Sequence, residues 1–444
     1  MINLLYICRS FAPVNNIASI RHSKLVKYFV RNGLNVTVIA ENLPPDIIQD
    51  PMLLSDEYKK ITLLRLPIHK SEKKIYINKN QKIFRNKNEF VLSLKRLKCV
   101  TQMLSYIRDV IYDLRFFNSC RKNMTLIENQ RNFDIIISSY RPFGAHWSAY
   151  YLYKNQKKKC FWIADFRDLP NDSKIYPEII KPLNNLIQAI VCNKADIVTT
   201  ISNGLRERLS KKIWIKKNQN LFHTITNGFD SEDQNFINYV RKKNDKFIIC
   251  YTGHIIEGKR DASLLFDSIS ELIKINVITK SSINLLFAGP QFSYQLLLQQ
   301  SKKFNLEEIV INMGYLLHHQ ILELQKESDL LLLLTSNNKN ESGILTGKFF
   351  EYVGSKRPII ALITGNLIGS EITRIITEYK VGYSFYYKNY DEAKIELSYK
   401  LKEFIYLKLQ LGEINDIQNE NILSFSYSEI TKKILNLYEK YKSP

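Results

Sequence analysis

The chain has 444 residues, of which 45% are hydrophobic and 24% are charged, and its formal net charge is +21. This composition excludes a mainly disordered, collagen-like or coiled-coil protein, and the length fits two or three domains of roughly 150 residues each. The charge excess indicates a polyanionic, nucleotide or anionic-membrane partner, unless it only reflects a codon bias that favours Lys, Asn and Ile.

Short apolar runs alternate with amphipathic stretches of helical length, which predicts βα units and hence an α/β fold with parallel sheets. In the first half, a helix is predicted from about Ala18 to Asn32. The predicted strands of this half are Asn3–Cys8, Asn35–Ala40, Ile61–Leu66, Asp134–Ser139, Cys160–Asp165, Asp196–Ile201 and His223–Thr226.

The pattern restarts after the polar junction that begins at Asn227–Asp230. The strands predicted in the second half are Phe247–Thr252, Asn284–Ala288, Ile309–Asn312, Leu330–Thr335 and Pro358–Ile363. We therefore predict two Rossmann-like domains, 1–230 and 231–424. An amphipathic C-terminal helix over 425–444 follows, with the N-terminal domain as one place where it could pack.

A basic insertion over 67–131 interrupts the alternation of the first half. It contains sixteen Lys and Arg residues when Arg65 is counted, against five Asp and Glu residues. Apolar residues recur within it at helical spacing: Leu94, Leu97, Val100, Leu104, Ile107, Ile111 and Leu114. Such a stripe is more often core packing, which is our expectation, and the functional alternative is a helix that lies on an anionic membrane.

A glycine-bearing loop follows the apolar run Leu330–Thr335 and leads into a predicted helix. The loop and helix start comprise Gly343, Ile344, Leu345, Thr346, Gly347 and Lys348, and Glu351 lies one turn further on. Free amides at a helix start after a buried parallel strand favour phosphate binding. A carboxylate one turn away could accept the hydroxyls of a ribose. The alternative is an ordinary surface pair between Lys348 and Glu351.

At this point the sequence resembles glycosyltransferase family 4, whose members are retaining enzymes of the GT-B fold. The segment Gly343 to Pro358 carries the resemblance most clearly. Further segments match in the same order: Phe11–Pro13 with Arg21, Phe161–Asp168, Ala195–Ser202, Ile225–Asp230, Tyr251–Gly253 with Lys259 and Arg260, and Phe287–Pro290. The resemblance implies two Rossmann-like domains whose parallel sheets face each other across a cleft.

The resemblance also implies the roles of individual residues. Glu351 would bind the donor ribose, and Lys259 or Arg260 would bind the pyrophosphate, with the choice left open. Gly253 and the residues Gly343 to Lys348 would complete the donor site. Asn15, Asn16 and Arg21 would form the acceptor or phosphate loop of the first domain.

Two departures from the family pattern limit this transfer. The usual glutamate pair is spaced E-x7-E, whereas here Glu341 precedes Glu351 by ten positions, so the role of the first glutamate is not assigned to it. The first loop also lacks the paired glycines that many members place near the phosphates.

Three further residues are candidates for catalysis. Arg167 and Asp168 follow a predicted buried strand, where open α/β sheets place ligand-binding residues. They could position the acceptor or the sugar, or form a structural salt bridge. His146 follows another strand and would face the cleft, although a lone histidine is more often structural.

The sequence predicts no metal or other cofactor, since no Asp-x-Asp triad is present to hold a metal-bridged pyrophosphate. The expected partners are a nucleotide sugar, a glycan or lipid-linked acceptor in surface polysaccharide synthesis, and an anionic membrane bound by the basic insertion. Six scattered cysteines indicate a reducing compartment, so we expect a cytoplasmic, peripheral enzyme at the inner face of the plasma membrane. A GT-B sugar-nucleotide epimerase is the alternative, and a nucleic-acid-binding protein is disfavoured because no binding motif is present.

Overall fold

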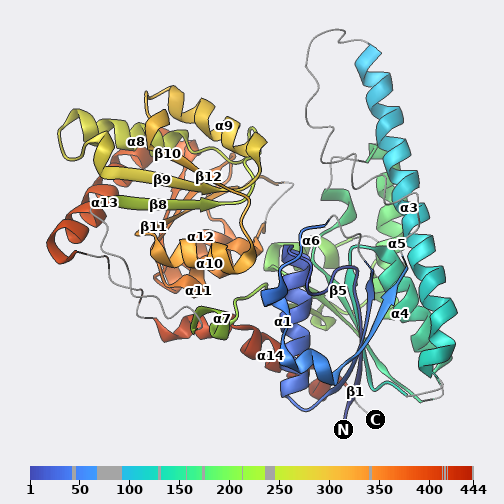
Figure 1. Cartoon of the computed structure of the whole chain (residues 1–444). Helices are drawn as coiled ribbons and strands as arrows, with labels where there is room; N and C mark the ends of the chain where they lie inside the picture. Colours follow the sequence, from blue (N-terminus) through green and yellow to red (C-terminus); the bar gives the residue numbers. More distant parts are fainter. Residues whose placement is uncertain are drawn as a thin grey trace. The chain divides into compact units, whose positions relative to one another are not determined.

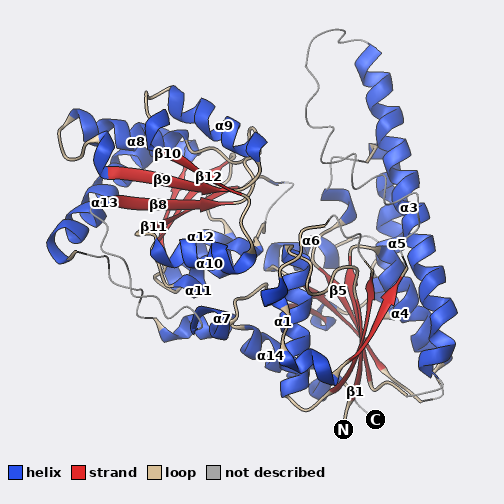
Figure 2. Ribbon diagram, viewed as in Figure 1, coloured by secondary structure: helices blue, strands red, loops and turns tan. Residues whose placement is uncertain are grey.

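The computed structural model describes residues 1–42, 47–67, 93–128, 132–156, 158–172, 176–212, 214–235, 246–339, 343–412, 414, 417 and 419–442. The chain divides into two compact units (Figure 1). Unit 1 comprises Met1–Thr226 and Ile430–Pro444, and unit 2 comprises Asn227–Glu429. Each unit is a parallel sheet with helices on both faces, which confirms the predicted pair of Rossmann-like folds (Figure 2).

Unit 1 contains a seven-stranded sheet in the order β3-β2-β1-β4-β5-β6-β7. Its strands are β1 (Asn3–Ile7), β2 (Asn35–Glu41), β3 (Thr62–Leu66), β4 (Ile135–Tyr140), β5 (Phe161–Phe166), β6 (Ile197–Thr200) and β7 (Phe222–Thr224). The strands predicted for this half agree with these bounds to within two residues. Strand order reverses between β1 and β4, which are hydrogen-bonded neighbours.

The helices of unit 1 are α1 (Ile17–Arg31), α3 (Ser93–Glu128), α4 (Phe143–Asn155), α5 (Lys181–Lys194) and α6 (Asn203–Ser210). Helix α14 (Tyr427–Tyr441) begins in unit 2 and ends in unit 1. Its last turns contact unit 1, since the Tyr438 ring lies 5.6 Å from that of Phe161 and the Tyr441 hydroxyl donates to the Asn220 carbonyl at 3.2 Å.

Helix α3 covers the second half of the predicted basic insertion, whereas residues 68–92 lie outside the described part of the chain. The helix packs closely on α4, because a Cβ at Gly144 would lie 2.4 Å from the Asp113 carbonyl oxygen. Its buried side chains include Tyr106, Phe116 and Cys120.

The predicted apolar stripe of α3 faces solvent. Val100, Leu104 and Leu114 are 56%, 60% and 47% exposed, and Ile107 and Ile111 are also exposed. The side chains of Leu94 and Leu97 lie outside the described residues. Core packing, the commoner outcome for such a stripe, is therefore the wrong interpretation here, because α3 buries a different face against α4. Over the described ranges, no helix has the length and apolarity required to cross a bilayer.

Unit 2 contains a six-stranded sheet in the order β10-β9-β8-β11-β12-β13. Its strands are β8 (Phe247–Thr252), β9 (Ile283–Ala288), β10 (Val310–Gly314), β11 (Leu330–Ser336), β12 (Ile359–Thr364) and β13 (Gly382–Tyr386). Its helices are α7 (Ser231–Asn235), α8 (Ser263–Lys274), α9 (Gln291–Lys302), α10 (His318–Glu327), α11 (Gly347–Ser355), α12 (Glu371–Glu378) and α13 (Tyr390–Leu411). Only the edge strand β13 was not predicted.

The central strand β11 explains why unit 2 has two hydrophobic cores. Leu330, Leu332 and Leu334 belong to the core under α8 and α13. Leu331 and Leu333 point to the opposite face and belong to the core under α11 and α12. Because successive side chains of a strand alternate between faces, a continuous apolar run fits a strand covered on both sides. Strand order reverses between β8 and β11, and open α/β sheets bind ligands beyond the carboxyl ends of strands at such a point.

Candidate functional site

In unit 2, backbone hydrogen bonds from glycines connect the carboxyl ends of three neighbouring strands. The Gly253 amide donates to the Ala288 carbonyl at 2.7 Å, and the Gly289 amide donates to the Gly314 carbonyl at 2.8 Å. Gly253 has a φ of +107° and would place a Cβ only 2.5 Å from the Nζ atom of Lys348. The backbone after β8 can therefore approach the start of α11 only because a glycine stands there.

Lys348 is a half-buried ammonium at this edge of the sheet. Its Nζ atom lies 4.5 Å from the centroid of the Tyr251 ring, within range of a cation–π interaction. Burial, and to a lesser extent the positive charge of Arg260, lowers the pKa of Lys348 to about 7. A cation held at this cost is poised to bind an anion, because a bound phosphate would restore the pKa of the ammonium.

The start of α11 presents backbone amides at the same place. Thr346 is the residue before the helix, and its Oγ1 atom is buried with no hydrogen-bond partner among the described residues. Leu345 is buried in the core, whereas Gly343 and Ile344 are half-buried. Tyr352 fixes the helix to the end of β8, because its hydroxyl accepts from the Thr252 amide at 3.0 Å. The first amides of a helix have no intrahelical acceptor and suit an anion.

Arg260 is a second cation that acts on this group of residues. Its Nη1 atom donates to the His254 carbonyl at 2.9 Å, the same oxygen that accepts from the Tyr251 hydroxyl at 2.6 Å. Its charge contributes to the lowered pKa values of Lys348 and His254. The backbone carbonyl of its neighbour Lys259 accepts from the Thr364 hydroxyl at 2.8 Å.

Glu351 lies one turn beyond Lys348 on α11. Its carboxylate is 15% exposed, and its Oε1 atom lies 3.8 Å from Nδ1 of His318. The other ring nitrogen of His318 lies 3.8 Å from Oδ2 of Asp233. A protonated His318 would therefore stand between two carboxylates. The negative charge of Glu351 partly offsets the lowering of the Lys348 pKa, so the two groups are close enough to interact electrostatically.

The structure thus brings Gly253, Arg260, Lys348, Glu351 and the loop from Gly343 to Gly347 together at the point where strand order reverses. These groups offer two cations, a helix start and, one turn along, a carboxylate. That set can bind a diphosphate and a vicinal diol. Within the described ranges, no group of three or more His, Cys, Asp or Glu residues could hold a metal ion.

The equivalent edge of unit 1 is occupied by a buried polar network. Arg21, 1% exposed, lies 3.3 Å from Oδ1 of Asp165 through its Nη2 atom and donates to the Ile225 and Thr226 carbonyls. Asp165 also accepts from Ser139 at 3.1 Å and from Thr199 at 2.8 Å. Arg21, predicted in the phosphate loop, is therefore bound inside unit 1 through Nη1 and Nη2, whereas its buried Nε atom has no hydrogen-bond partner among the described residues.

The other predicted residues of unit 1 lie around this network. Arg167 donates through Nε to the Ser139 hydroxyl and the Tyr140 carbonyl, both at 3.1 Å, whereas Asp168 is exposed. Asn16 caps α1, because its Oδ1 atom accepts from the Ser19 amide at 2.8 Å. Asn15 precedes it and is half-buried.

His146 lies in the interior of unit 1. It is fully buried beside the rings of Tyr140 and Phe166, its Nδ1 atom is 2.7 Å from the Ser138 hydroxyl, and burial lowers its pKa to about 3. A neutral, enclosed imidazole packs and orients its neighbours. The site proposed below does not use it as a catalyst.

Sequence reasoning missed several residues of these two edges. The motif around Tyr251 does not reveal that its ring contacts the Lys348 ammonium. His318 and Asp233 gave no signal, because their relation to Glu351 arises only in the fold. His22, whose Nε2 atom is 3.1 Å from the Ser139 hydroxyl, was hidden in an amphipathic helix. Charged or polar residues in the buried positions of a helix are the signal that could have found it.

No protein-family model and no curated protein sequence matches the chain. Solved structures do match along its whole length. The glycosyltransferase from Rickettsia africae ESF-5 has a TM-score of 0.57 and 14% identity, over 100% of this chain and 99% of that one. The chain has the GT-B fold.

Two further structures extend this comparison. A variant of S. aureus TarM, in complex with fondaparinux, α-GlcNAc-glycerol and UDP, has a TM-score of 0.55 and 11% identity over 99% of this chain and 100% of that one. A putative UDP-N-acetylglucosamine 2-epimerase from Listeria monocytogenes has a TM-score of 0.54 and 12% identity over 100% of this chain and 98% of that one. The GT-B fold therefore occurs here in proteins of more than one activity, and at such low identity the likeness concerns the fold alone.

Proposed function

We propose that this protein is a retaining glycosyltransferase of the family 4 type, in which unit 2 binds a nucleotide sugar. Unit 1 would bind the acceptor, a glycan or a lipid-linked saccharide of cell-surface polysaccharide synthesis, to which a hexose is transferred. The observation that carries the proposal is Lys348. Its half-buried ammonium lies against Gly253 and Tyr251 at the start of α11, with a pKa lowered to about 7.

During transfer, this site would stabilise the nucleoside diphosphate as it leaves the sugar. Lys348, Arg260 and the first amides of α11 would neutralise the developing charge. Positive groups fixed in advance in a half-buried site lower the energy of such a transition state without a metal ion. Glu351 would accept the ribose hydroxyls. Retention of the anomeric configuration, which the sequence resemblance implies, would use a donor phosphate oxygen as the base.

Two of the similar structures support a nucleotide sugar as the donor. TarM was solved with UDP, and the Listeria protein is named for a UDP sugar. The proposed place of work is the inner face of the plasma membrane, in the cytoplasm. The exposed apolar stripe of α3 and the basic composition of the insertion support a peripheral contact with anionic lipids.

A thermal-shift panel of UDP, GDP, dTDP and CMP tests the donor site directly, because a ligand that binds only the native state raises the apparent stability. We expect at least one of the diphosphates to stabilise unit 2. Glu351→Gln should weaken that nucleotide at least about tenfold, since hydrogen bonds to a charged group contribute about 1.5–3 kcal/mol. The matched control is Glu378→Gln, an exposed glutamate at the end of α12. No shift with any nucleotide contradicts the donor site, and an unchanged affinity in Glu351→Gln contradicts the ribose assignment.

A sugar-nucleotide epimerase is the second candidate, because an epimerase shares this fold over the whole chain. It would use the same donor site without an acceptor. Conversion of a free nucleotide sugar to its epimer in the absence of any glycan would favour it, whereas transfer that requires an added acceptor would favour the glycosyltransferase.

A further inference from the structure

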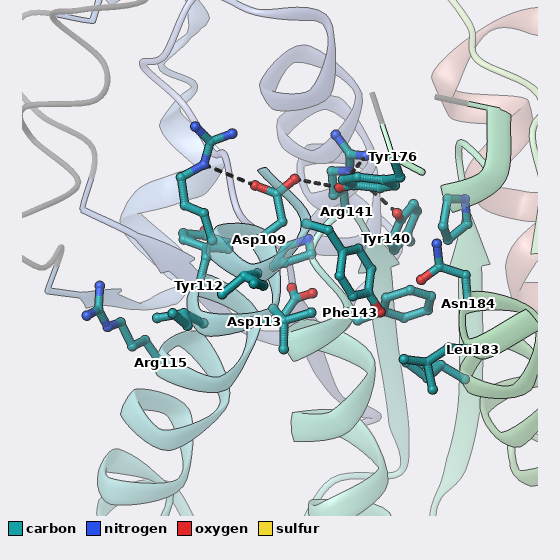
Figure 3. A pocket seen from close by; sticks show the side chains of 18 of the residues that line it. Asp109, Tyr112, Asp113, Arg115, Tyr140, Arg141, Phe143, Tyr176, Leu183 and Asn184 are labelled. Atoms are coloured by element: carbon teal, nitrogen blue, oxygen red, sulfur yellow. Dashed lines mark hydrogen bonds and ion pairs between the residues drawn. The ribbon is translucent and has the colours of Figure 1, made fainter. Parts of the chain in front are cut away.

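A cavity of about 510 Å³ lies in unit 1 between α3, α5 and the start of α4 (Figure 3). Its volume is within the range of small-molecule sites, roughly 300–1,000 Å³. Most of its wall is apolar, and the residues that form this part include Ile107, Val110, Phe143, Trp147, Leu183 and Ile187. Among the features that the sequence analysis names, the apolar stripe of α3 contributes Leu104, Ile107 and Ile111 to it.

One side of the cavity carries a cation held between two phenol rings. The guanidinium of Arg141 lies 5.9 Å from the Tyr140 ring and 5.8 Å from the Tyr176 ring. It donates to the two hydroxyls, through Nε to Tyr140 at 3.4 Å and through Nη2 to Tyr176 at 3.2 Å (Figure 3). Among the described residues, Nη1 of Arg141 makes no hydrogen bond. The planar group is therefore oriented in advance and keeps donor capacity for a ligand.

The remaining charges of the cavity are mostly positive or internally paired. Arg9 is paired with Glu41 at 3.2 Å, and Arg108 lies 3.5 Å from Asp109, which also accepts from the Tyr176 hydroxyl. Arg115 adds a further cation to the lining, and Asp113 adds a carboxyl group whose pKa burial raises to about 7. A bound group should accordingly be mainly apolar with one anionic end near Arg141.

The cavity is continuous with an exposed apolar surface. Leu104, Ile107 and Ile111 line it from α3 and are also 60%, 46% and 42% exposed. On α5, Leu183 lines it and is exposed, and Leu186 and Ile190 continue the exposed stripe along that helix. Two neighbouring helices with apolar solvent-facing stripes, on a chain of net charge +21, match the surface of an anionic bilayer.

We propose that this cavity receives the hydrocarbon chain of a lipid-linked acceptor, whose phosphate is bound by Arg141, while α3 and α5 lie on the membrane that supplies it. The inference rests on the proposed glycosyltransferase function and selects the acceptor class: an amphiphilic lipid phosphate. A soluble sugar would leave most of the apolar wall without a partner, and a bare phosphate would leave the cavity empty.

Trp147 lines the cavity and supplies the signal for a test. A short alkyl phosphate with bromine on its chain, kept below its micellar concentration, should quench the fluorescence of the full-length protein, and Trp147→Phe should remove that component. Inorganic phosphate and a neutral alkyl glucoside should each compete at least about tenfold less well, since each offers only half of the required chemistry. Competition by a soluble disaccharide as strong as by the alkyl phosphate would overturn the proposal.

Two variants test whether the alkyl phosphate binds in this cavity. Val110→Phe, which fills the apolar part, and Arg141→Gln, which removes the charge, should each weaken quenching at least about tenfold. Their matched controls are Ile395→Phe, at an exposed position on α13, and Arg121→Gln, at an exposed position on α3; both should stay within about twofold of the wild type. Unchanged quenching in Val110→Phe or Arg141→Gln overturns the inference. The nucleotide shift is measured on the same variants and reports on the donor site alone, so failure of the lipid site and failure of the proposed function are separate results.

Discussion

In unit 2, Gly253 and Gly289 directly follow β8 and β9, and Gly314 is the last residue of β10. In unit 1, the ends of β4, β5 and β6 carry Ser139, Asp165 and Thr199. These three polar residues are register partners across neighbouring strands. Ser139 and Thr199 donate to Asp165, which in turn accepts from Nη2 of Arg21. Gly253 instead leaves room for the Lys348 side chain at the start of α11, and Gly289 leaves room for the backbone of Gly253.

The difference shows how one topology serves two purposes. Where strand order reverses, a sheet leaves a crevice at its carboxyl edge. In unit 2, Lys348 and the start of α11 lie at this edge, where we propose the nucleotide site. Unit 1 fills its crevice with an internal ion pair, and a cavity of about 510 Å³ lies elsewhere in it, between α3 and α5.

The largest expected effect is on stability, from removal of one partner of the ion pair in unit 1. Asp165→Ala leaves the guanidinium of Arg21 buried without its carboxylate, which typically costs about 3–5 kcal/mol of unfolding free energy. Denaturant unfolding of the variant measures it. Asp56→Ala is the control, because Asp56 pairs with Lys59 at 2.7 Å on the surface, where such pairs contribute at most about 1 kcal/mol. A loss in Asp165→Ala no larger than in the control would mean that the network does not hold unit 1 together.

Most strands of both units can be predicted from the sequence. Apolar runs such as Leu330–Thr335 and Phe247–Thr252 predicted the strands, because a strand buried on both faces needs a side chain of the same kind at every position. The edge strand β13 is not predicted from the sequence, because Gly382 and the exposed Tyr383 interrupt any such run.

The site was predictable in part, for a related reason. Glycines after strands and a lysine in a first helical turn are local signals, and they led to Gly253 and Lys348. Asp165, the partner of Arg21, lies 144 residues further along the chain, so no local sequence pattern indicates that Arg21 is buried. The stripe of α3 was recognised as helical, but periodicity does not reveal which face meets a neighbour. The buried face is set by the contact between Gly144 and Asp113.

The second effect concerns ligand binding at the edge of unit 2. In Gly253→Ala the new Cβ would meet Nζ and Cε of Lys348 at 2.5 and 3.0 Å. The flexible lysine can move away, so the protein should fold, with a strain cost of about 1–3 kcal/mol for a non-glycine residue in this backbone conformation. The displaced ammonium should weaken the nucleotide about tenfold, as measured by titration calorimetry.

Gly412→Ala is the matched control for that variant. Gly412 also has a positive φ, of +75°, but no atom lies within 4 Å of its Cβ position. It should reproduce the strain and leave nucleotide affinity within about twofold. Equal loss of affinity in both variants would show that backbone strain, and not the position of Lys348, governs binding.

The smallest effects concern two groups that titrate near neutrality, one in each unit. Burial raises the pKa of Asp113 from 3.8 to about 7 and lowers the pKa of Lys348 from 10.5 to about 7. Native Asp113 holds more protons than the unfolded chain between these two pH values, so its contribution to the unfolding free energy falls as pH rises from about 4 to 7. Native Lys348 holds fewer protons than the unfolded chain above pH 7, so its contribution rises with pH from about 7 to 10.5.

Two variants separate these slopes. Asp113→Asn keeps an oxygen that can accept from the Gly144 amide, as Asp113 does at 3.2 Å, but cannot ionise. Its stability relative to the wild type should rise by on the order of 1 kcal/mol between pH 4 and 7, after allowance for partial exposure. The stability of Lys348→Met relative to the wild type should fall by a similar amount between pH 7 and 9.5. Urea unfolding in half-unit pH steps measures both. Slopes of the same sign would contradict the assignment, because a buried acid and a buried base must respond to pH in opposite directions.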